Sequence, residues 1–184
     1  MVFESWAANA WAFHFVNGIA GPSLTKFMLL IADSFWVIIP IIAIYLYLKK
    51  DKNIYAYMLG VVVIYIIADI IKLITMEPRP CAVSSLSWIN HPVCETTSAF
   101  PSEHAAVLSG IPIFLSKYKI LNVLYIIWVI LVLFGRVYLG LHYLSDVIAG
   151  VILSILIWYV IYTYRLIISK KGQGILHLIK EQKR

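Results

Sequence analysis

Charged residues are scarce in this chain, and their scarcity excludes an ordinary soluble domain. Asp, Glu, Lys and Arg make up 13% of the 184 residues, whereas soluble domains usually carry about 25%. Hydrophobic residues make up 62% of the chain, and its mean hydropathy is +0.89. The sequence therefore predicts an integral membrane protein. We expect residues 1–184 to form a single domain, because the chain is too short for a second.

Internal repeats and a continuous basic surface are also lacking. The absence of a visible repeat argues against a transporter built from two related halves. The net charge is +6, but the basic residues lie in short clusters between apolar segments rather than on one face. This placement argues against a nucleic-acid partner and favours the membrane bilayer.

Cysteine occurs only twice, at Cys81 and Cys94. Both lie in the long polar segment 76–100. In an oxidising compartment the two can pair, and closing a loop of about 14 residues would contribute on the order of 3 kcal/mol. Two free thiols are the alternative.

Long hydrophobic runs are what the sequence has in abundance. They occur at about 25–48, 53–75, 103–116, 120–140 and 143–165. A membrane span needs roughly 20 residues, and the run 103–116 would cover only about 21 Å as a helix, so it should begin below the membrane surface. Residues 1–24 are rich in aromatic side chains that suit the lipid–water interface. The predicted fold is all-α: five transmembrane helices and an N-terminal interfacial helix.

The distribution of Lys and Arg predicts the orientation. Basic residues follow the first, third and fifth runs, and they account for eleven of the fifteen in the chain. By the positive-inside rule this side is cytoplasmic, as is the C-terminus. Four basic residues remain, namely Lys26, Lys72, Arg79 and Arg136. The last three therefore belong to the periplasmic or exterior side of a cell membrane.

His142 and Asp146 are the first candidate functional pair. On a helix their spacing of four residues would put both on one face. A carboxylate beside an imidazole fixes its tautomer and leaves the other ring nitrogen free as a nucleophile or base. Arg136, six residues earlier, can hold phosphate oxygens in a bidentate manner. The alternative is that Asp146 only caps a helix or pairs with Arg136.

Two further clusters flank other apolar runs on the same side. Pro101, Ser102, Glu103 and His104 open the third run, where helix N–H groups and the Ser102 hydroxyl can bind an anion and His104 can donate a proton. An ordinary capped helix start is the alternative. Lys72 and Arg79 lie around the end of the second run. A lone lysine there often only snorkels to the interface, but convergence with the other clusters favours a phosphate site.

The spacing of these residues resembles the three-part signature of the type-2 phosphatidic acid phosphatase superfamily. The parts are Lys72 with six residues before Arg79-Pro80, then Pro101-Ser102-x-His104, then Arg136 with five residues before His142 and three more before Asp146. The resemblance covers most of the chain. It extends to Phe15-Val16-Asn17-Gly18 and to Gly140-Leu141-His142-Tyr143.

The resemblance implies a membrane lipid phosphatase with a defined site. His142 would attack phosphorus and form a phosphohistidine, oriented by Asp146, while His104 would protonate the leaving group. The phosphoryl oxygens would be held by Lys72, Arg79, Ser102, Arg136 and the backbone N–H of Glu103. No metal or other cofactor is implied, and the sequence offers no carboxylate cluster for Mg²⁺ at this site.

Two positions depart from the family pattern. The family usually has glycine where this chain has Glu103, and serine where it has Gly135. We expect the Glu103 carboxylate to point away from the phosphate, leaving its N–H available. The acidic variant is similar to undecaprenyl-pyrophosphate phosphatases, which recycle the lipid carrier of cell-wall synthesis, and the outward-facing site agrees with that substrate. Phosphatidic acid or phosphatidylglycerol phosphate is the alternative substrate. A catalytically silent lipid-binding scaffold is the alternative class.

Overall fold

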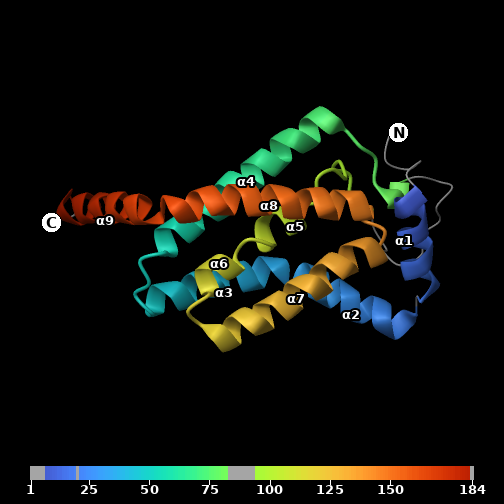
Figure 1. Ribbon diagram of the computed structural model, residues 1–184, viewed down its shortest axis with the longest axis horizontal. Coiled ribbons are helices and arrows are strands. Elements are labelled where there is room, and N and C mark those ends of the chain that lie inside the picture. Colours follow the sequence, from blue (N-terminus) through green and yellow to red (C-terminus); the bar gives the residue numbers. More distant parts are fainter. Residues whose placement is uncertain (1–6, 20, 83–93, 183–184) are drawn as a thin grey trace.

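Helices form nearly all of the structure that the computed structural model describes, which comprises residues 7–19, 21–82 and 94–182 (Figure 1). Lys183 and Arg184 of the basic C-terminal segment lie outside these ranges. In chain order the elements are α1 (Ala7–Gly18), α2 (Pro22–Asp33), α3 (Phe35–Leu48), α4 (Ile54–Thr75), the 3₁₀ turn η1 (Pro80–Ala82), α5 (Glu103–Leu108), α6 (Pro112–Leu115), α7 (Lys119–Tyr138), α8 (Leu144–Thr163) and α9 (Arg165–Gln182).

Three segments in the described ranges are long and apolar enough to span a membrane: Ile54–Ala82, which contains α4, and the helices α7 and α8. The pair α2 and α3 counts as a fourth if its 42° bend is accepted within one span. Ser34 lies at the bend, where its hydroxyl donates to the Ile31 carbonyl at 2.6 Å. The Trp128 indole on α7 donates to the same hydroxyl at 2.9 Å, so the bend is held by a neighbouring helix.

The prediction of five spanning helices is therefore not confirmed. The run 103–116 forms two short helices, α5 and α6, and Glu103–Leu115 is too short to count as a span. Between α5 and α6, the Gly110 N–H donates to the Ser154 hydroxyl at 2.9 Å. Proline at position 112 has no N–H for a continuous helix. A helix, α1, lies within the N-terminal segment, and its predicted position at the lipid–water interface stays a prediction.

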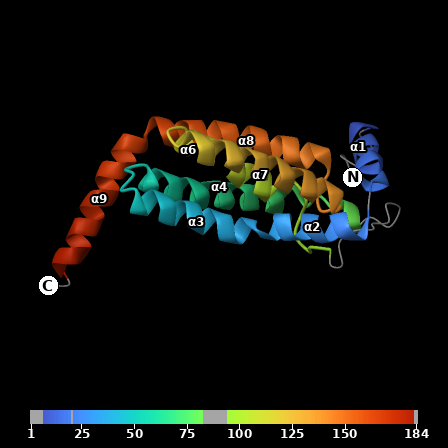
Figure 2. The ribbon, with the colours of Figure 1, turned by 90° about the horizontal axis from the view of Figure 1, so that it is seen from below.

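The longer helices lie along one axis, with different elements at the two ends (Figures 1 and 2). Helix α1 lies across one end, and α9 extends from the opposite end. The α3–α4 and α6–α7 connections lie at the α9 end, where Lys117 Nζ forms an ion pair with Asp51 at 2.6 Å. The basic connections predicted to share a side thus lie at one end of the bundle.

Trp158 fixes the packing of α8 against α4 and α5. Its indole is buried, and Nε1 donates to the Val107 carbonyl at 3.0 Å. A Cβ atom at Gly60 or at Gly110 would lie 2.1 Å from the ring. Only the missing side chains at these positions let the ring fit between the helices.

Gly150 brings α8 directly against the start of α5. A Cβ atom at this position would lie 2.6 Å from the Ser102 carbonyl oxygen and 2.7 Å from Ala105 Cβ. Close packing here therefore places Ser102, a candidate site residue, beside α8.

Replacing Gly150 with alanine should destabilise the protein by about 1–3 kcal/mol, because the new methyl group overpacks a site bounded by backbone. It should also lower activity by moving Ser102. Gly174→Ala is the matched control, since a Cβ atom there meets nothing within 4 Å. Thermal unfolding in detergent measures both variants. Equal melting temperatures for the two would contradict the packing argument.

Candidate active site

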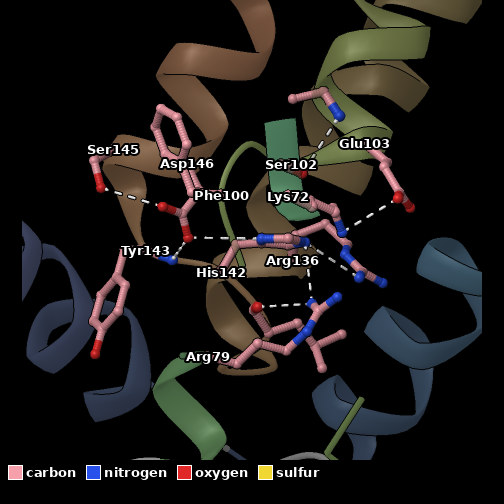
Figure 3. Close-up of polar contacts among 12 residues, drawn as sticks. Lys72, Arg79, Phe100, Ser102, Glu103, Arg136, His142, Tyr143, Ser145 and Asp146 are labelled. Carbon is pink, nitrogen blue, oxygen red and sulfur yellow. Dashed lines mark hydrogen bonds and ion pairs between the residues drawn. The ribbon is translucent and has the colours of Figure 1, made fainter. Parts of the chain in front are cut away.

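The three polar clusters of the sequence come together at the end of the bundle nearest α1. Figure 3 shows seven of the eight predicted residues around one centre. They come from α4 and the segment after it, from the start of α5 and the residue before it, from α7, and from α8 and the turn before it: Lys72, Arg79, Ser102, Glu103, Arg136, His142 and Asp146. The eighth, His104, follows directly after Glu103 on α5.

His142 lies in the turn between α7 and α8, with only 1% of its surface exposed. The N–H groups of Leu141 and His142 both donate to the Arg136 carbonyl, at 3.1 and 3.2 Å. The turn passes through Gly140 at a φ of +69°, a conformation that favours glycine. These contacts hold the imidazole at the centre of the site.

Asp146 has two roles at the start of α8. Its Oδ2 accepts from the Tyr143 N–H at 2.8 Å, which caps the helix. The same oxygen lies 3.6 Å from His142 Nδ1. The two residues do not share a helical face, because α8 begins at Leu144. Asp146 therefore caps α8 and also lies beside His142 Nδ1, which is buried and has no hydrogen-bond partner in the described structure.

The other imidazole nitrogen, Nε2, faces two arginines. Arg79 Nη1 lies 3.3 Å from it and Arg136 Nη2 lies 3.4 Å from it. If the proton of the neutral ring is on Nδ1, facing Asp146, the lone pair on Nε2 is directed at the two guanidinium groups. A phosphoryl group held by these arginines would thus lie next to a nitrogen lone pair.

Burial and positive charge both act on His142. Burial is the largest influence, followed by the charges of Arg136 and Arg79, and together they hold the imidazole pKa well below its ordinary value of 6.5. The imidazole is therefore neutral at physiological pH, the state in which it can act as a nucleophile.

A contact from α1 supports Asp146, and the sequence analysis did not predict it. The Asn9 side chain is fully buried. It donates to the Ser145 hydroxyl at 2.9 Å and accepts from the Ser145 N–H at 3.0 Å. Ser145 Oγ in turn lies 3.4 Å from Asp146 Oδ1. Asn9 is thus a positioning residue that acts through Ser145.

Replacing Asn9 with alanine should lower kcat about tenfold with little change in KM, because misplacement of a catalytic group by a fraction of an ångström is costly while phosphate contacts stay intact. Steady-state kinetics on detergent-solubilised protein measures this split. Trp11→Ala, at a position 68% exposed on the same helix, is the control for docking of α1. Similar kcat values for both variants would rule out a specific role for the Asn9 amide.

The α5 cluster lies on the other side of the centre. Ser102 caps α5, accepting from the Ala105 N–H at 3.5 Å, and its own N–H donates to the Asp146 carbonyl at 3.1 Å. His104 packs against Phe35, with ring centroids 4.5 Å apart. Burial, followed by the charges of Arg136, Lys72 and Arg79, lowers the pKa of the His104 imidazole well below its ordinary value of 6.5. A bound phosphate dianion would oppose this shift by placing negative charge beside the ring.

Glu103 differs from expectation. Its carboxylate does not point away from the phosphate-binding groups but lies 3.3 Å from Lys72 Nζ. Lys72 is 3% exposed, and a buried ammonium group needs a partner. The acidic side chain therefore neutralises one of the predicted phosphate ligands in the free protein.

Glu95 and Thr97 join the site from the segment before α5, and sequence reasoning missed both. Glu95 pairs with Arg79 at 2.6 Å and with Arg136 at 2.8 Å. Burial opposes its ionisation, but the charges of Arg136 and Arg79 outweigh burial and lower the carboxyl pKa. Thr97 accepts from Arg79 twice, through its carbonyl at 2.7 Å and its hydroxyl at 2.8 Å.

A disulfide anchors this segment. Cys81 and Cys94 are bonded, with Cα atoms 5.7 Å apart, which confirms the pairing and excludes the two-thiol alternative. The Cys81 N–H donates to the Gly140 carbonyl at 3.0 Å. The bond thus ties the residue before Glu95 to the turn that carries His142.

The fold is a bundle of apolar helices long enough to span a membrane, and its candidate site gathers three buried cations around a buried imidazole. The model of the PAP2 superfamily matches residues 53–168, which is more than half of the chain. The chain belongs to the PAP2 superfamily.

One protein of similar sequence and two solved structures of similar fold illustrate the relationship. An undecaprenyl-diphosphatase from Sulfolobus acidocaldarius is 30% identical over 122 residues, which are 65% of this chain and 59% of that protein. The chain thus spans less than two thirds of that relative. LpxE from Aquifex aeolicus has a similar fold, with a TM-score of 0.75 at 23% identity over 89% of this chain and 100% of that one. A transmembrane PAP2-type phosphatidylglycerolphosphate phosphatase from Bacillus subtilis also has a similar fold, with a TM-score of 0.67 at 24% identity over 85% of this chain and 84% of that one.

Proposed function

We propose that this protein is an integral membrane lipid phosphatase that hydrolyses an undecaprenyl-type polyprenyl pyrophosphate to the monophosphate through a phosphohistidine at His142. The observation that carries the proposal is the placement of this imidazole. Asp146 lies 3.6 Å from one ring nitrogen, and two arginines lie 3.3 and 3.4 Å from the other. This arrangement presents a neutral nucleophile to a tetrahedral anion.

In the first step the His142 Nε2 lone pair attacks the terminal phosphorus. The bond from phosphorus to the bridging oxygen breaks, and that oxygen leaves with the bonding electrons and a proton from His104. Arg79, Arg136 and Lys72 neutralise the charge that accumulates on the non-bridging oxygens. Ser102 and the Glu103 N–H, at the start of α5, complete the set of donors.

In the second step water attacks the phosphohistidine. The water gives a proton to His104, the phosphorus–nitrogen bond breaks, and its electron pair returns to Nε2. Inorganic phosphate leaves and both histidines regain their starting states. Asp146 stabilises the positive imidazole while the phosphorus–nitrogen bond exists. Positive side chains rather than a metal supply the charge neutralisation in this mechanism.

An apolar groove beside His104 supports a lipid substrate. It has a volume of about 260 Å³ and lies between α3 and α4, with lining residues that include Phe35, Trp36, Val62 and Tyr65. Phe35 is also the ring that packs on His104. A hydrocarbon tail in this groove would leave its phosphate headgroup next to the proton donor.

Two observations favour a polyprenyl pyrophosphate as the headgroup and tail. The curated relative is named as an undecaprenyl-diphosphatase. The acidic residue at position 103 resembles the variant found in undecaprenyl-pyrophosphate phosphatases. The basic connections at the end of the bundle opposite α1 support an outward-facing site and a cytoplasmic C-terminus in a cell membrane. Because α1 supplies Asn9 to the site, we infer that residues 1–184 act as one phosphatase domain.

The test is phosphate release by the purified protein in detergent, with EDTA present. The substrates are undecaprenyl pyrophosphate, phosphatidic acid and phosphatidylglycerol phosphate, and His142→Ala is the control. We expect turnover that EDTA leaves unchanged and that is fastest on the pyrophosphate.

The other outcomes separate the alternatives. A preference for either glycerophospholipid would keep the mechanism and replace the substrate. Loss of turnover in EDTA would contradict metal independence. A folded protein that releases phosphate from none of the three lipids would contradict the phosphatase itself and favour a lipid-binding scaffold.

A further inference from the structure

The two arginines that face His142 are already occupied in the free site. Glu95 Oε2 pairs with Arg79 Nη2 at 2.6 Å, and Oε1 pairs with Arg136 Nη2 at 2.8 Å. One carboxylate thus bridges both guanidinium groups, each of which also lies within 3.4 Å of His142 Nε2. Two oxygens of a phosphoryl group would need the same positions.

From this bridge we propose that Glu95 is a specificity-determining residue. Its carboxylate occupies the phosphoryl-oxygen positions on Arg79 and Arg136, and a dianionic terminal phosphate displaces it far better than a monoanionic phosphodiester. The inference rests on the proposed function, because it concerns which phosphate groups enter that same site. It adds a selection step against the diester lipids that make up the surrounding bilayer.

The donors of Arg79 show why Glu95 has to move. A guanidinium group has five N–H bonds. Thr97 accepts from Nε and Nη2 at 2.7 and 2.8 Å, and Leu141 accepts from Nη1 at 2.9 Å. The remaining contacts go to His142 Nε2 and Glu95. Three bonds therefore hold the arginine to the protein, and the one directed at Glu95 is the one that a substrate oxygen can take over.

Arg136 has donor capacity that the carboxylate does not use. Its Nε is buried, and in the part of the chain that the structure describes this atom has no hydrogen-bond partner. A carboxylate offers two oxygens, whereas a terminal phosphate offers three. A phosphate that replaces Glu95 can therefore keep both ion pairs and bring a third oxygen to the cations.

The solvent exposure of the arginines and of Glu95 shows which partner of these ion pairs can move. The side chains of Arg79 and Arg136 are 2% and 4% exposed, whereas that of Glu95 is 39% exposed. The carboxylate can turn into water while the arginines stay in the wall of the site. The adjacent Cys81–Cys94 disulfide keeps it close, so it competes at a high effective concentration.

The charge of the ligand then determines how well it displaces Glu95. A phosphate monoester or terminal pyrophosphate carries close to two negative charges at pH 7. A phosphodiester carries one, like the carboxylate that it must replace. Replacing the Glu95 carboxylate with a phosphodiester therefore adds little electrostatic attraction. Replacing it with a terminal phosphate places about one more negative charge beside the two arginines and Lys72.

The first test measures binding of inorganic phosphate without turnover. In a His142→Ala background, Glu95→Gln should tighten phosphate binding at least tenfold, measured by the phosphate concentration that raises the melting temperature in detergent. Glu95→Ala should give the same change, which guards against an effect of the new amide. Asp69→Asn removes an equal charge at an exposed position and should leave the affinity unchanged.

The second test measures selectivity in the active protein. Phosphatidylglycerol, a monoanionic diester, should inhibit the Glu95→Gln variant competitively and the unaltered protein at least tenfold more weakly. Unchanged or weaker phosphate binding in both Glu95 variants would overturn the inference and make Glu95 a support for the arginines. Because the first test needs no catalysis, absence of turnover on every lipid would defeat the proposed function alone and leave this result readable.

Discussion

Replacing His142 with alanine should reduce phosphate release to background, a loss on the order of 10⁴-fold or more, as expected when a covalent nucleophile is removed. The imidazole lies between Asp146 and the two arginines, so its removal takes away the nucleophile at that position. Phosphate release from the preferred lipid, measured with purified protein in detergent, checks the loss.

The control is that the His142→Ala variant remains folded and still binds inorganic phosphate. Arg79 keeps its bonds to Thr97 and Leu141, and Arg136 keeps its ion pair with Glu95, so the variant should retain its melting shift with inorganic phosphate. A labelled substrate provides a direct complement. The unaltered protein should carry label that is lost in acid and kept in alkali, the behaviour of a phosphorus–nitrogen bond. More than a few per cent of the original turnover in His142→Ala would place the nucleophile elsewhere.

The sequence predicted much of this arrangement because its signals are local. Polar residues next to apolar runs are costly unless they are used, and their spacing within each cluster survives folding. Lys72 and Arg79 lie around the end of one helix, Ser102 and His104 at the start of another, and Arg136 and His142 around a single turn. Each cluster could therefore be recognised in the sequence, but the contacts between the clusters could not be predicted.

What the sequence could not show depends on contacts between distant segments. Asn9 and Ser145 are 136 residues apart, and a single asparagine in an aromatic N-terminal segment gives no periodic signal. Glu95 lies in a loop, where nothing in the sequence indicates that two arginines enclose it. Its neighbour Cys94 was the one available clue, since a disulfide to Cys81 had to bring this loop back towards Arg79.

The predicted count of five spans is not confirmed, and the Glu103 carboxylate does not point in the predicted direction; both differences have physical reasons. Hydropathy registers the run 103–116 as one segment but does not register the interruption at Gly110 and Pro112. At position 103 we weighed repulsion between the carboxylate and the substrate, but in the free site the stronger demand comes from the buried Lys72 ammonium, 3.3 Å away. A buried cation without a partner would cost more than a carboxylate near an unoccupied anion site.

The second large effect is expected at His104 and depends on the leaving group. His104→Asn should slow hydrolysis of phosphatidic acid about 10²–10⁴-fold, the usual contribution of a positioned proton donor. The leaving alkoxide there is strongly basic and needs the proton. A pyrophosphate expels a phosphate monoester, which is far less basic, so the loss should be smaller. An aryl phosphate whose phenol is more acidic than a phosphate monoester (second pKa about 6) should lose least of all.

This graded response separates proton donation from a structural role. Phe35 packs on the His104 ring, so a variant that only loosened this contact would lower all three rates by a similar factor. Phe35→Leu is the matched control for that case. Because Phe35 also lines the apolar groove proposed for the lipid tail, this control is compared on the two lipid substrates, which it should slow equally. Rates of His104→Asn that fall in proportion to leaving-group basicity would assign the proton to His104. The rates are compared as kcat/KM, which covers the steps up to departure of the leaving group and excludes the shared hydrolysis of the phosphohistidine. Equal losses in kcat/KM on all three would instead assign this residue to packing and leave the proton donor to be found among the other groups around His142.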